Sequence, residues 1–157
     1  STRVRSSAAS DVYKRQGLEH AEFHRYGVMH RNSFLDSPRL LDADYHFRGQ
    51  DGLYFAGQMT GVEGYMESAA SGILAGKNLA RHLQGKPPLI LPRETMMGAL
   101  AAYISSAPTE NFQPMGANMG ILPDLPERIR GKQEKYQVYA DRGMAALEQA
   151  LSEMEQV

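Results

Sequence analysis

The chain has 157 residues, of which 42% are hydrophobic and 22% are charged. These values are ordinary for a folded domain and exclude a disordered or fibrous chain. The formal net charge is −1, from 17 Lys and Arg against 18 Asp and Glu, which argues against a strongly basic nucleic-acid platform. No apolar run approaches the roughly 18 residues of a membrane span. The absence of cysteine excludes disulfides, thiolate metal ligands and a cysteine nucleophile within this chain.

The histidines do not predict a metal site. None of His20, His24, His30, His46 and His82 lies in a zinc-ligand array such as H-E-x-x-H. His20 and His24 are four residues apart and would share one face of a helix, but a metal also needs further ligands at the right geometry. We therefore expect no metal in this chain.

Residues 1–16 differ in composition from the rest of the chain. They are small, polar and basic, and they lack the apolar core of a signal peptide. Their Arg and Ser content also fits a transit peptide. We interpret them as a linker or adaptor that is not native to the protein, and we exclude them from the functional argument.

The next part of the chain predicts short extended segments separated by turns. Alternating apolar residues over 20–29 and apolar pairs between 40 and 47 predict short strands. The turn-rich stretch 32–38 separates them. The compact apolar run 53–56 predicts a buried strand, which ends at Gly57.

Helices are predicted over most of the remainder. Apolar residues at three- and four-residue spacing predict a helix over 65–83, which Gly85 and the prolines after it would stop. A second helix is expected over 94–104 and a third over 127–155. Between them, 108–126 has no period, and loops of that length are uncommon and often functional.

A glycine-rich loop joins the predicted strand 53–56 to the helix 65–83. Its spacing, Gly57-x-x-x-Gly61-x-x-Gly64, is neither the G-x-G-x-x-G dinucleotide fingerprint nor a phosphate-binding P-loop. Glycine lets a ligand approach the backbone closely, and the start of a helix favours an anionic group or a carbonyl. Two interpretations stay open: a ligand site, or a tight strand-to-helix turn in an ordinary α/β domain.

Polar and aromatic residues near the loop allow two interpretations each. Glu63 is either a carboxylate favoured by the helix dipole or a contact to a cofactor or substrate. Tyr65 is either a core residue of the first turn or a ring that faces a ligand. Upstream, the adjacent His30, Arg31 and Asn32 follow an apolar stretch, and polar residues at strand ends often contact ligands. Their alternative is a surface turn. From the residues alone, the sequence predicts an incomplete α/β segment that binds a cofactor.

Three stretches carry a resemblance to a known family. They are GLEHAEFHRYGVMHRNSFLDSP at 17–38, DGLYFAGQMTGVEGYMESAASGILAGKNLAR at 51–81, and FQPMGANMGILPDLP at 112–126. Together they strongly resemble the folate- and FAD-dependent tRNA (uracil-C5-)-methyltransferases, the TrmFO family of GidA-like flavoproteins. The resemblance runs from residue 17 to the end of the chain.

The resemblance implies an activity and a fold. Such enzymes transfer the methylene carbon of methylenetetrahydrofolate to C5 of the T-loop uridine in tRNA, with reduced FAD as reductant and NAD(P)H re-reducing the flavin. They are cytoplasmic bacterial proteins.

The implied fold class is α/β: the C-terminal part of a glutathione-reductase-type FAD-binding domain with a mainly helical C-terminal extension. In that scheme 17–50 closes an inserted domain and returns to the FAD domain. Residues 51–86 give the last strand, glycine-rich loop and helix of the FAD domain, and 87–157 form the extension.

The resemblance also implies roles for individual residues. Those matching the family's FAD-contacting loop are Gly57, Gln58, Met59, Thr60, Gly61, Val62, Gly64 and Tyr65. His30 matches a position expected to stack on the folate pterin over the flavin. Arg31, Asn32 and Glu63 would line the same folate or substrate pocket.

The sequence departs from the family pattern in two ways. It has neither the dinucleotide fingerprint nor the cysteines used in the family's chemistry, so no catalytic residue is assigned in this chain. We therefore expect the chain to be the C-terminal third of the enzyme, with the missing N-terminal part as its partner. We expect the isolated chain neither to methylate tRNA nor to hold FAD tightly.

Two alternatives remain at this point. One is a fragment of another GidA-like tRNA-modifying flavoprotein. The other is a non-enzymatic helical module that binds RNA or protein. The second is suggested by the long terminal helix and by four basic residues with acidic neighbours, Arg128, Arg130, Lys132 and Lys135.

Overall fold

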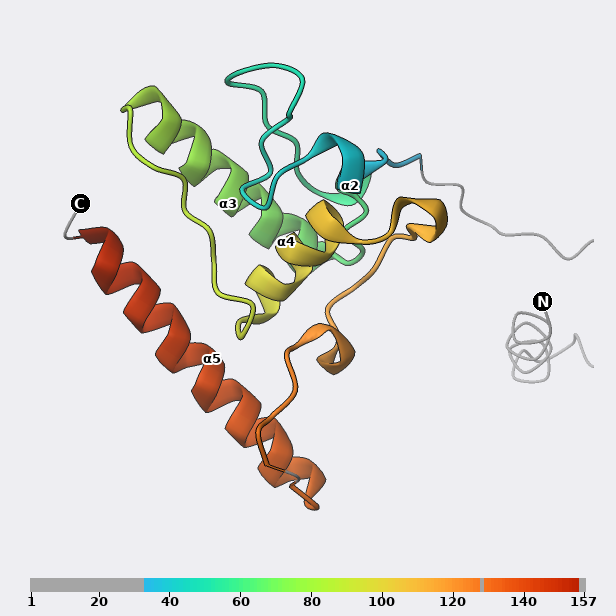
Figure 1. Ribbon diagram of the computed structural model, residues 1–157, viewed down its shortest axis with the longest axis vertical. Helices are drawn as coiled ribbons and strands as arrows, with labels where there is room; N and C mark the ends of the chain where they lie inside the picture. The colour runs from blue at the N-terminus through green and yellow to red at the C-terminus, as the bar shows by residue number, and fades with distance from the viewer. Residues whose placement is uncertain (1–32, 128, 156–157) are drawn as a thin grey trace, which may run out of the picture. The chain divides into compact units, whose positions relative to one another are not determined.

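Helices dominate the computed structural model, which describes residues 33–127 and 129–155 (Figure 1). The α-helices are α2 (Ser37–Leu40), α3 (Tyr65–Leu83), α4 (Met96–Ser106) and α5 (Lys132–Glu155). Three short 3-10 helices are η1 (Gln58–Thr60), η2 (Thr109–Asn111) and η3 (Met119–Ile121). No helix in the described part of the chain is both long and apolar enough to cross a membrane.

Extended pairing is sparse within the described residues. It consists of three isolated bridges, Leu41 with Phe47, His46 with Tyr54, and Val62 with Met115. The predicted buried strand over 53–56 is wrong in this structure, since the run contributes a single isolated bridge, at Tyr54, and is half-buried. Among the described residues, this run pairs with the turn around residues 45–47, where Phe47 N–H donates to Leu53 O at 2.8 Å and Phe55 N–H donates to Tyr45 O at 3.0 Å. The strand predicted over 20–29 lies outside the described residues.

The prediction for α3 is confirmed at both ends. The helix begins after Gly64, whose φ of 109° is incompatible with helical backbone geometry. At its other end, Gly85 N–H donates to His82 O at 2.9 Å and Lys86 N–H donates to Arg81 O at 2.9 Å. These two bonds form a Schellman motif, which satisfies carbonyls that the helix leaves unpaired.

The two later helices are also confirmed, with shifted starts. The helix α4 begins at Met96 rather than 94, because Thr95 caps it: its Oγ1 accepts from Gly98 N–H at 2.9 Å. The helix α5 begins at Lys132 rather than 127. The predicted loop 108–126 is irregular apart from η2 and η3. The turn-rich stretch before Pro38 ends in the short helix α2, which has a proline in its first turn.

The core forms where α3 and α4 meet the turn that contains Tyr45. Its buried apolar members are Leu41, Tyr45, Val62, Leu74, Ala75, Leu89, Leu91, Leu100, Ala101, Ile104 and Phe112. The helix α5 packs through Tyr139 against a smaller cluster, and through Leu147 and Met154 against the main one. In Figure 1, α5 (red) runs as a long separate rod beside α3 (green) and α4 (yellow).

Tyr45 is held in a conformation that few non-glycine residues adopt. Its φ is 70°, yet its backbone N–H donates to Asp42 O at 2.9 Å and its carbonyl accepts from Phe55 N–H at 3.0 Å. Its side chain is 2% exposed, and burial raises the pKa of Tyr45 to about 12. Burial of the ring therefore offsets the cost of the left-handed backbone, which is of order 1–3 kcal/mol.

The carboxamide of Asn78 ties three parts of the chain together inside this core. Its Nδ2 donates to Asp44 O at 3.2 Å and to Leu89 O at 3.1 Å. Its Oδ1 accepts from Leu89 N–H at 2.6 Å. Asn78 is 1% exposed, so water cannot reach these backbone groups to replace the hydrogen bonds of its carboxamide. Asn78 thus holds the turn before Tyr45 and the segment after α3 against the same helix.

Replacing Asn78 should therefore cost far more stability than replacing an exposed asparagine. Asn78→Ala leaves three buried backbone groups unpaired, and we expect the free energy of unfolding to fall by about 2–4 kcal/mol. Urea denaturation of the 157-residue chain measures this change. Asn111→Ala, in exposed η2, is the matched control and should change it by less than about 0.5 kcal/mol. Equal effects of the two substitutions would contradict the role given to Asn78.

Candidate functional site

The candidate site is built on a loop whose backbone only glycine adopts easily. Gly57, Gly61 and Gly64 have φ values of 74°, 85° and 109°. All three lie in the left-handed region, where a Cβ is strained. The loop contains η1 and then turns directly into α3, so the first turn of the helix points out of the loop.

Hydrogen bonds to small buried hydroxyls fix the shape of this loop. Gly57 N–H donates to Ser71 Oγ at 2.8 Å, and Ser71 Oγ donates to Ser68 O at 2.7 Å. Thr60 Oγ1 donates to Gly57 O at 2.8 Å. Ser71 and Thr60 are buried, so the loop is rigidly tied to the helix that follows it.

The start of α3 is open to solvent. Gly64 provides no side-chain cap for the first N–H groups, and the helix dipole places partial positive charge there. Tyr65 is 94% exposed and Met66 is 80% exposed. Within the part of the chain that the structure describes, Tyr65 therefore belongs to no buried core. Next to them, Ser68 Oγ is buried and has no hydrogen-bond partner among the described residues.

A second segment, which the sequence did not assign to the site, lies along this loop. We call Phe112–Asn118 the strap. Met115 N–H donates to Gly61 O at 2.8 Å, and Glu63 N–H donates to Met115 O at 3.0 Å. These bonds make the parallel bridge between Val62 and Met115. The signal for the strap was the long period-less loop 108–126, but spacing alone could not show where that loop folds back.

The strap also explains why residue 61 is glycine. A Cβ at this position would lie 2.5 Å from Cζ of the Phe112 ring. Phe112 is buried and packs against Tyr103, with ring centroids 5.7 Å apart. Gly61 therefore admits an aromatic ring of this chain, in addition to any role toward a cofactor.

The structure places the predicted cofactor residues on one continuous loop with two kinds of exposure. The exposed members are Gln58, Met59, Gly64 and Tyr65, together with Glu63 of the predicted folate pocket. Thr60 and Val62 are fully buried, so their side chains support the loop from inside. His30, Arg31 and Asn32 lie outside the described residues.

A small polar pocket of about 120 Å³ lies elsewhere, beside the last turn of α3. His46 Nε2 and His82 Nε2 lie 3.8 Å and 3.5 Å from the same oxygen of Asp51. Burial raises the pKa of nearby Tyr54, and the negative charges of Asp44 and Asp51 add to the effect. Within 33–127 and 129–155, no group of three or more potential ligands is arranged to hold a metal ion.

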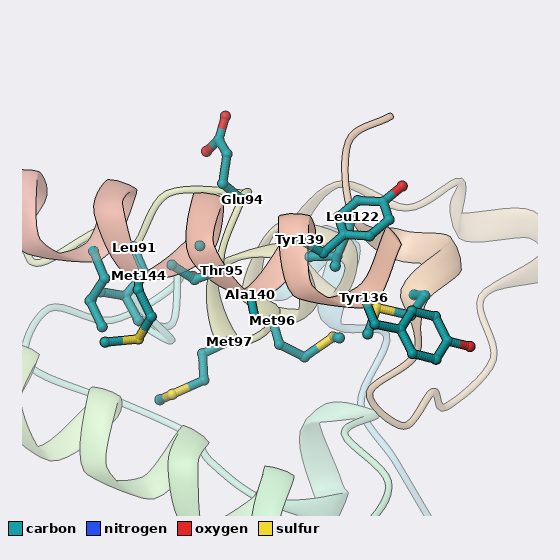
Figure 2. A pocket seen from close by; sticks show the side chains of 13 residues that line it. Leu91, Glu94, Thr95, Met96, Met97, Leu122, Tyr136, Tyr139, Ala140 and Met144 are labelled. Atoms are coloured by element: carbon teal, nitrogen blue, oxygen red, sulfur yellow. The ribbon is translucent and has the colours of Figure 1, made fainter. Parts of the chain in front are cut away.

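A larger cavity, of about 420 Å³, lies between α5 and the start of α4. Figure 2 shows Met96 and Met97 of α4 and Met144 of α5 among its lining residues, with the carboxylate of Glu94 pointing away from these side chains. Tyr136 and Tyr139 close one end. The lining offers few polar groups to orient a ligand, so it has none of the chemistry of the glycine-rich loop.

Comparison with known proteins assigns the chain to a family. The profile of the family described as glucose inhibited division protein A matches residues 4–87, more than half of the chain. The chain belongs to this GidA family. The match includes the whole glycine-rich loop and α3.

Curated relatives with one name match most of the chain. The relative from Enterococcus faecalis, named methylenetetrahydrofolate–tRNA-(uracil-5-)-methyltransferase TrmFO, is 55% identical over 139 residues. That match covers 88% of this chain and 32% of the relative. Relatives with the same name from Ligilactobacillus salivarius and Natranaerobius thermophilus are 59% and 52% identical, over 82% and 94% of the chain. They are covered to 29% and 34%, so this GidA-family chain spans about a third of the length of these relatives.

The geometry at residue 61 predicts a strong local effect of substitution. Gly61→Ala forces an L residue to a φ of 85° and pushes its Cβ into the Phe112 ring. We expect the free energy of unfolding to fall by about 1–3 kcal/mol, since strain and overpacking act together. Urea denaturation again provides the measurement.

Gly72→Ala is the matched control within α3. A Cβ at Gly72 meets no atom within 4 Å, and the residue lies inside the helix. Alanine should therefore stabilise the chain by about 0.5–1 kcal/mol. If Gly61→Ala is also neutral or stabilising, Phe112 does not pack beneath the loop as described.

Proposed function

We propose that this chain is part of a flavoenzyme that methylates C5 of the T-loop uridine in tRNA. Methylenetetrahydrofolate would be the carbon donor and reduced FAD the reductant, with NAD(P)H re-reducing the flavin. The observation that carries the proposal is the 52–59% identity, over 82–94% of the chain, to relatives named for transfer from this folate to tRNA uracil. A tRNA substrate also supports a cytoplasmic location.

The glycine-rich loop and the start of α3 are the residues that fit FAD. Three glycines let a flat ligand approach the backbone, and the first turn of α3 offers N–H groups without a side-chain cap. The buried Ser68 Oγ, which has no hydrogen-bond partner within residues 33–127 and 129–155, adds a polar group beside them. We propose that Gly57–Tyr65 hold the flavin and that the helix dipole favours negative charge on its ring.

The finer fold assignment is part of the same proposal. We infer that 51–86 completes a FAD-binding domain of the glutathione-reductase type, whose remaining strands would come from the part of the relatives that this chain does not span. Exposed Tyr65, Met66 and Ile73 on α3 support this, because a helix that exposes large apolar side chains has room for a further partner.

Within the site, bound FAD would supply the reducing equivalents, and the protein would bind and orient the substrates. His30 would stack on the folate pterin, because an imidazole ring can pack against a flat heterocycle. Arg31 could hold a folate carboxylate with two parallel hydrogen bonds. Asn32 and the exposed Glu63 would provide further polar contacts in the same pocket. These residues would raise the rate by holding the carbon donor in line with the uridine.

A chimeric enzyme tests the proposal directly. The matching 139 residues of the Enterococcus faecalis relative are replaced by those of this chain. We expect the purified chimera to retain FAD and to transfer labelled carbon from methylenetetrahydrofolate to C5 of the T-loop uridine, detected by mass spectrometry of digested tRNA. A chimera that folds and binds FAD but modifies a different uridine would favour another GidA-like tRNA-modifying enzyme. A folded chimera without FAD would overturn the flavin proposal.

His30→Ala in this chimera separates folate binding from flavin binding. We expect FAD content to be unchanged and methylation at limiting folate to fall by about tenfold, because a stacking interaction is lost. His82→Ala, which removes an imidazole outside the glycine-rich loop, is the control and should leave both quantities unchanged. Loss of FAD from the His30 variant would show that His30 belongs to the flavin site.

A further inference from the structure

Glu67 joins the strap to the start of α3. It is the third residue of the helix, and its Oε1 accepts from Ala117 N–H at 3.1 Å. Its Oε2 lies against Gly64, so closely that a Cβ on residue 64 would collide with it. One carboxylate therefore contacts the strap with one oxygen and the glycine-rich loop with the other.

This contact completes the attachment of the strap to the loop. Met115 pairs with the backbone on both sides of Val62, and Phe112 packs beneath Gly61. Two residues beyond Met115, the Ala117 N–H donates to the carboxylate of Glu67. Gly116 keeps the strap close, since a Cβ there would lie 3.3 Å from Glu63 O. The far end of the strap thus depends on a side chain, whereas its middle depends on backbone pairing.

We propose that Glu67 is a positioning residue of the cofactor site, which fixes the strap on the glycine-rich loop and places one negative charge at the first turn of α3. This inference rests on the proposed function. The inference extends the proposed flavin site by the strap, as a second segment beside the glycine-rich loop, and by Glu67, as a residue that sets the charge near the flavin.

The charge of Glu67 has a consequence opposite to that of the helix dipole. The dipole at the start of α3 favours electron density on a neighbouring group, whereas a carboxylate in the same turn disfavours it. The flavin site would therefore hold reduced, electron-rich flavin less tightly than the dipole alone would allow. Removing the charge, while keeping the hydrogen-bond acceptor, should shift the reduction potential of bound flavin to a more positive value.

Two substitutions at residue 67 in the chimera test the two parts of this role. Glu67→Gln keeps an oxygen that can accept from Ala117 N–H but removes the charge. We expect FAD affinity to change by less than about threefold, and the reduced form to gain about tenfold over the oxidised form, equivalent to about 30 mV for a two-electron couple. Glu67→Ala removes the acceptor as well. We expect it to weaken FAD affinity by about tenfold, because the end of the strap is released.

A matched control and a direct readout make the outcomes distinct. Glu110→Gln, an isosteric change in exposed η2, should leave both affinity and potential unchanged. Spectroelectrochemical titration of the bound flavin measures the potential without reference to turnover. An unchanged or more negative potential in Glu67→Gln would overturn the proposal, as would equal FAD affinity in Glu67→Ala and the unsubstituted chimera. Absence of FAD from the unsubstituted chimera would instead refute the proposed function itself.

Discussion

The position of α3 depends on the buried carboxamide of Asn78. An apolar side chain in its place would leave the backbone of Asp44 and Leu89 without partners in a core that excludes water. Because Asn78 bonds both segments, the turn that contains Tyr45 and the chain that leaves α3 lie on one face of the helix. That face also carries Ser71, whose hydroxyl holds Gly57. The polar residues of α3 thus fix both its packing and the loop before it.

This arrangement leaves part of the apolar surface of α3 uncovered. The apolar residues at helical spacing include Met66, Ile73 and Leu83, and all three are exposed. The face of α3 that is buried instead carries apolar Leu74 and Ala75 next to Ser71 and Asn78, and the hydrogen bonds of the last two residues hold this face in the core. The match covers about a third of the relatives' length. The remaining two thirds of those proteins would be long enough to cover the exposed apolar side chains of α3.

The sequence predicted local features of the fold better than the pairing of distant segments. The bounds of α3 follow from a glycine before it and a glycine after it, so they could be predicted from neighbours in sequence. The strand over 53–56 could not be judged in this way, since a strand depends on partners that composition does not reveal. The glycine-rich loop was recognisable by its spacing. The strap was not, because its contact with that loop joins residues about 50 positions apart, such as Glu67 and Ala117.

The glycine-rich loop and the strap can lie close together because each contains a glycine, which has no Cβ, at a point of contact. Gly61 makes room for Phe112, and Gly116 makes room for the Glu63 carbonyl. Backbone pairing at Met115 then holds the two segments in register. The exposed edge of this pair consists of backbone groups and the first turn of α3. Such an edge can meet a flat ligand along its length, while Thr60 and Val62 support it from within. If FAD binds here as proposed, backbone groups held by buried residues would make most of the contacts, which is consistent with the few reactive side chains on this loop.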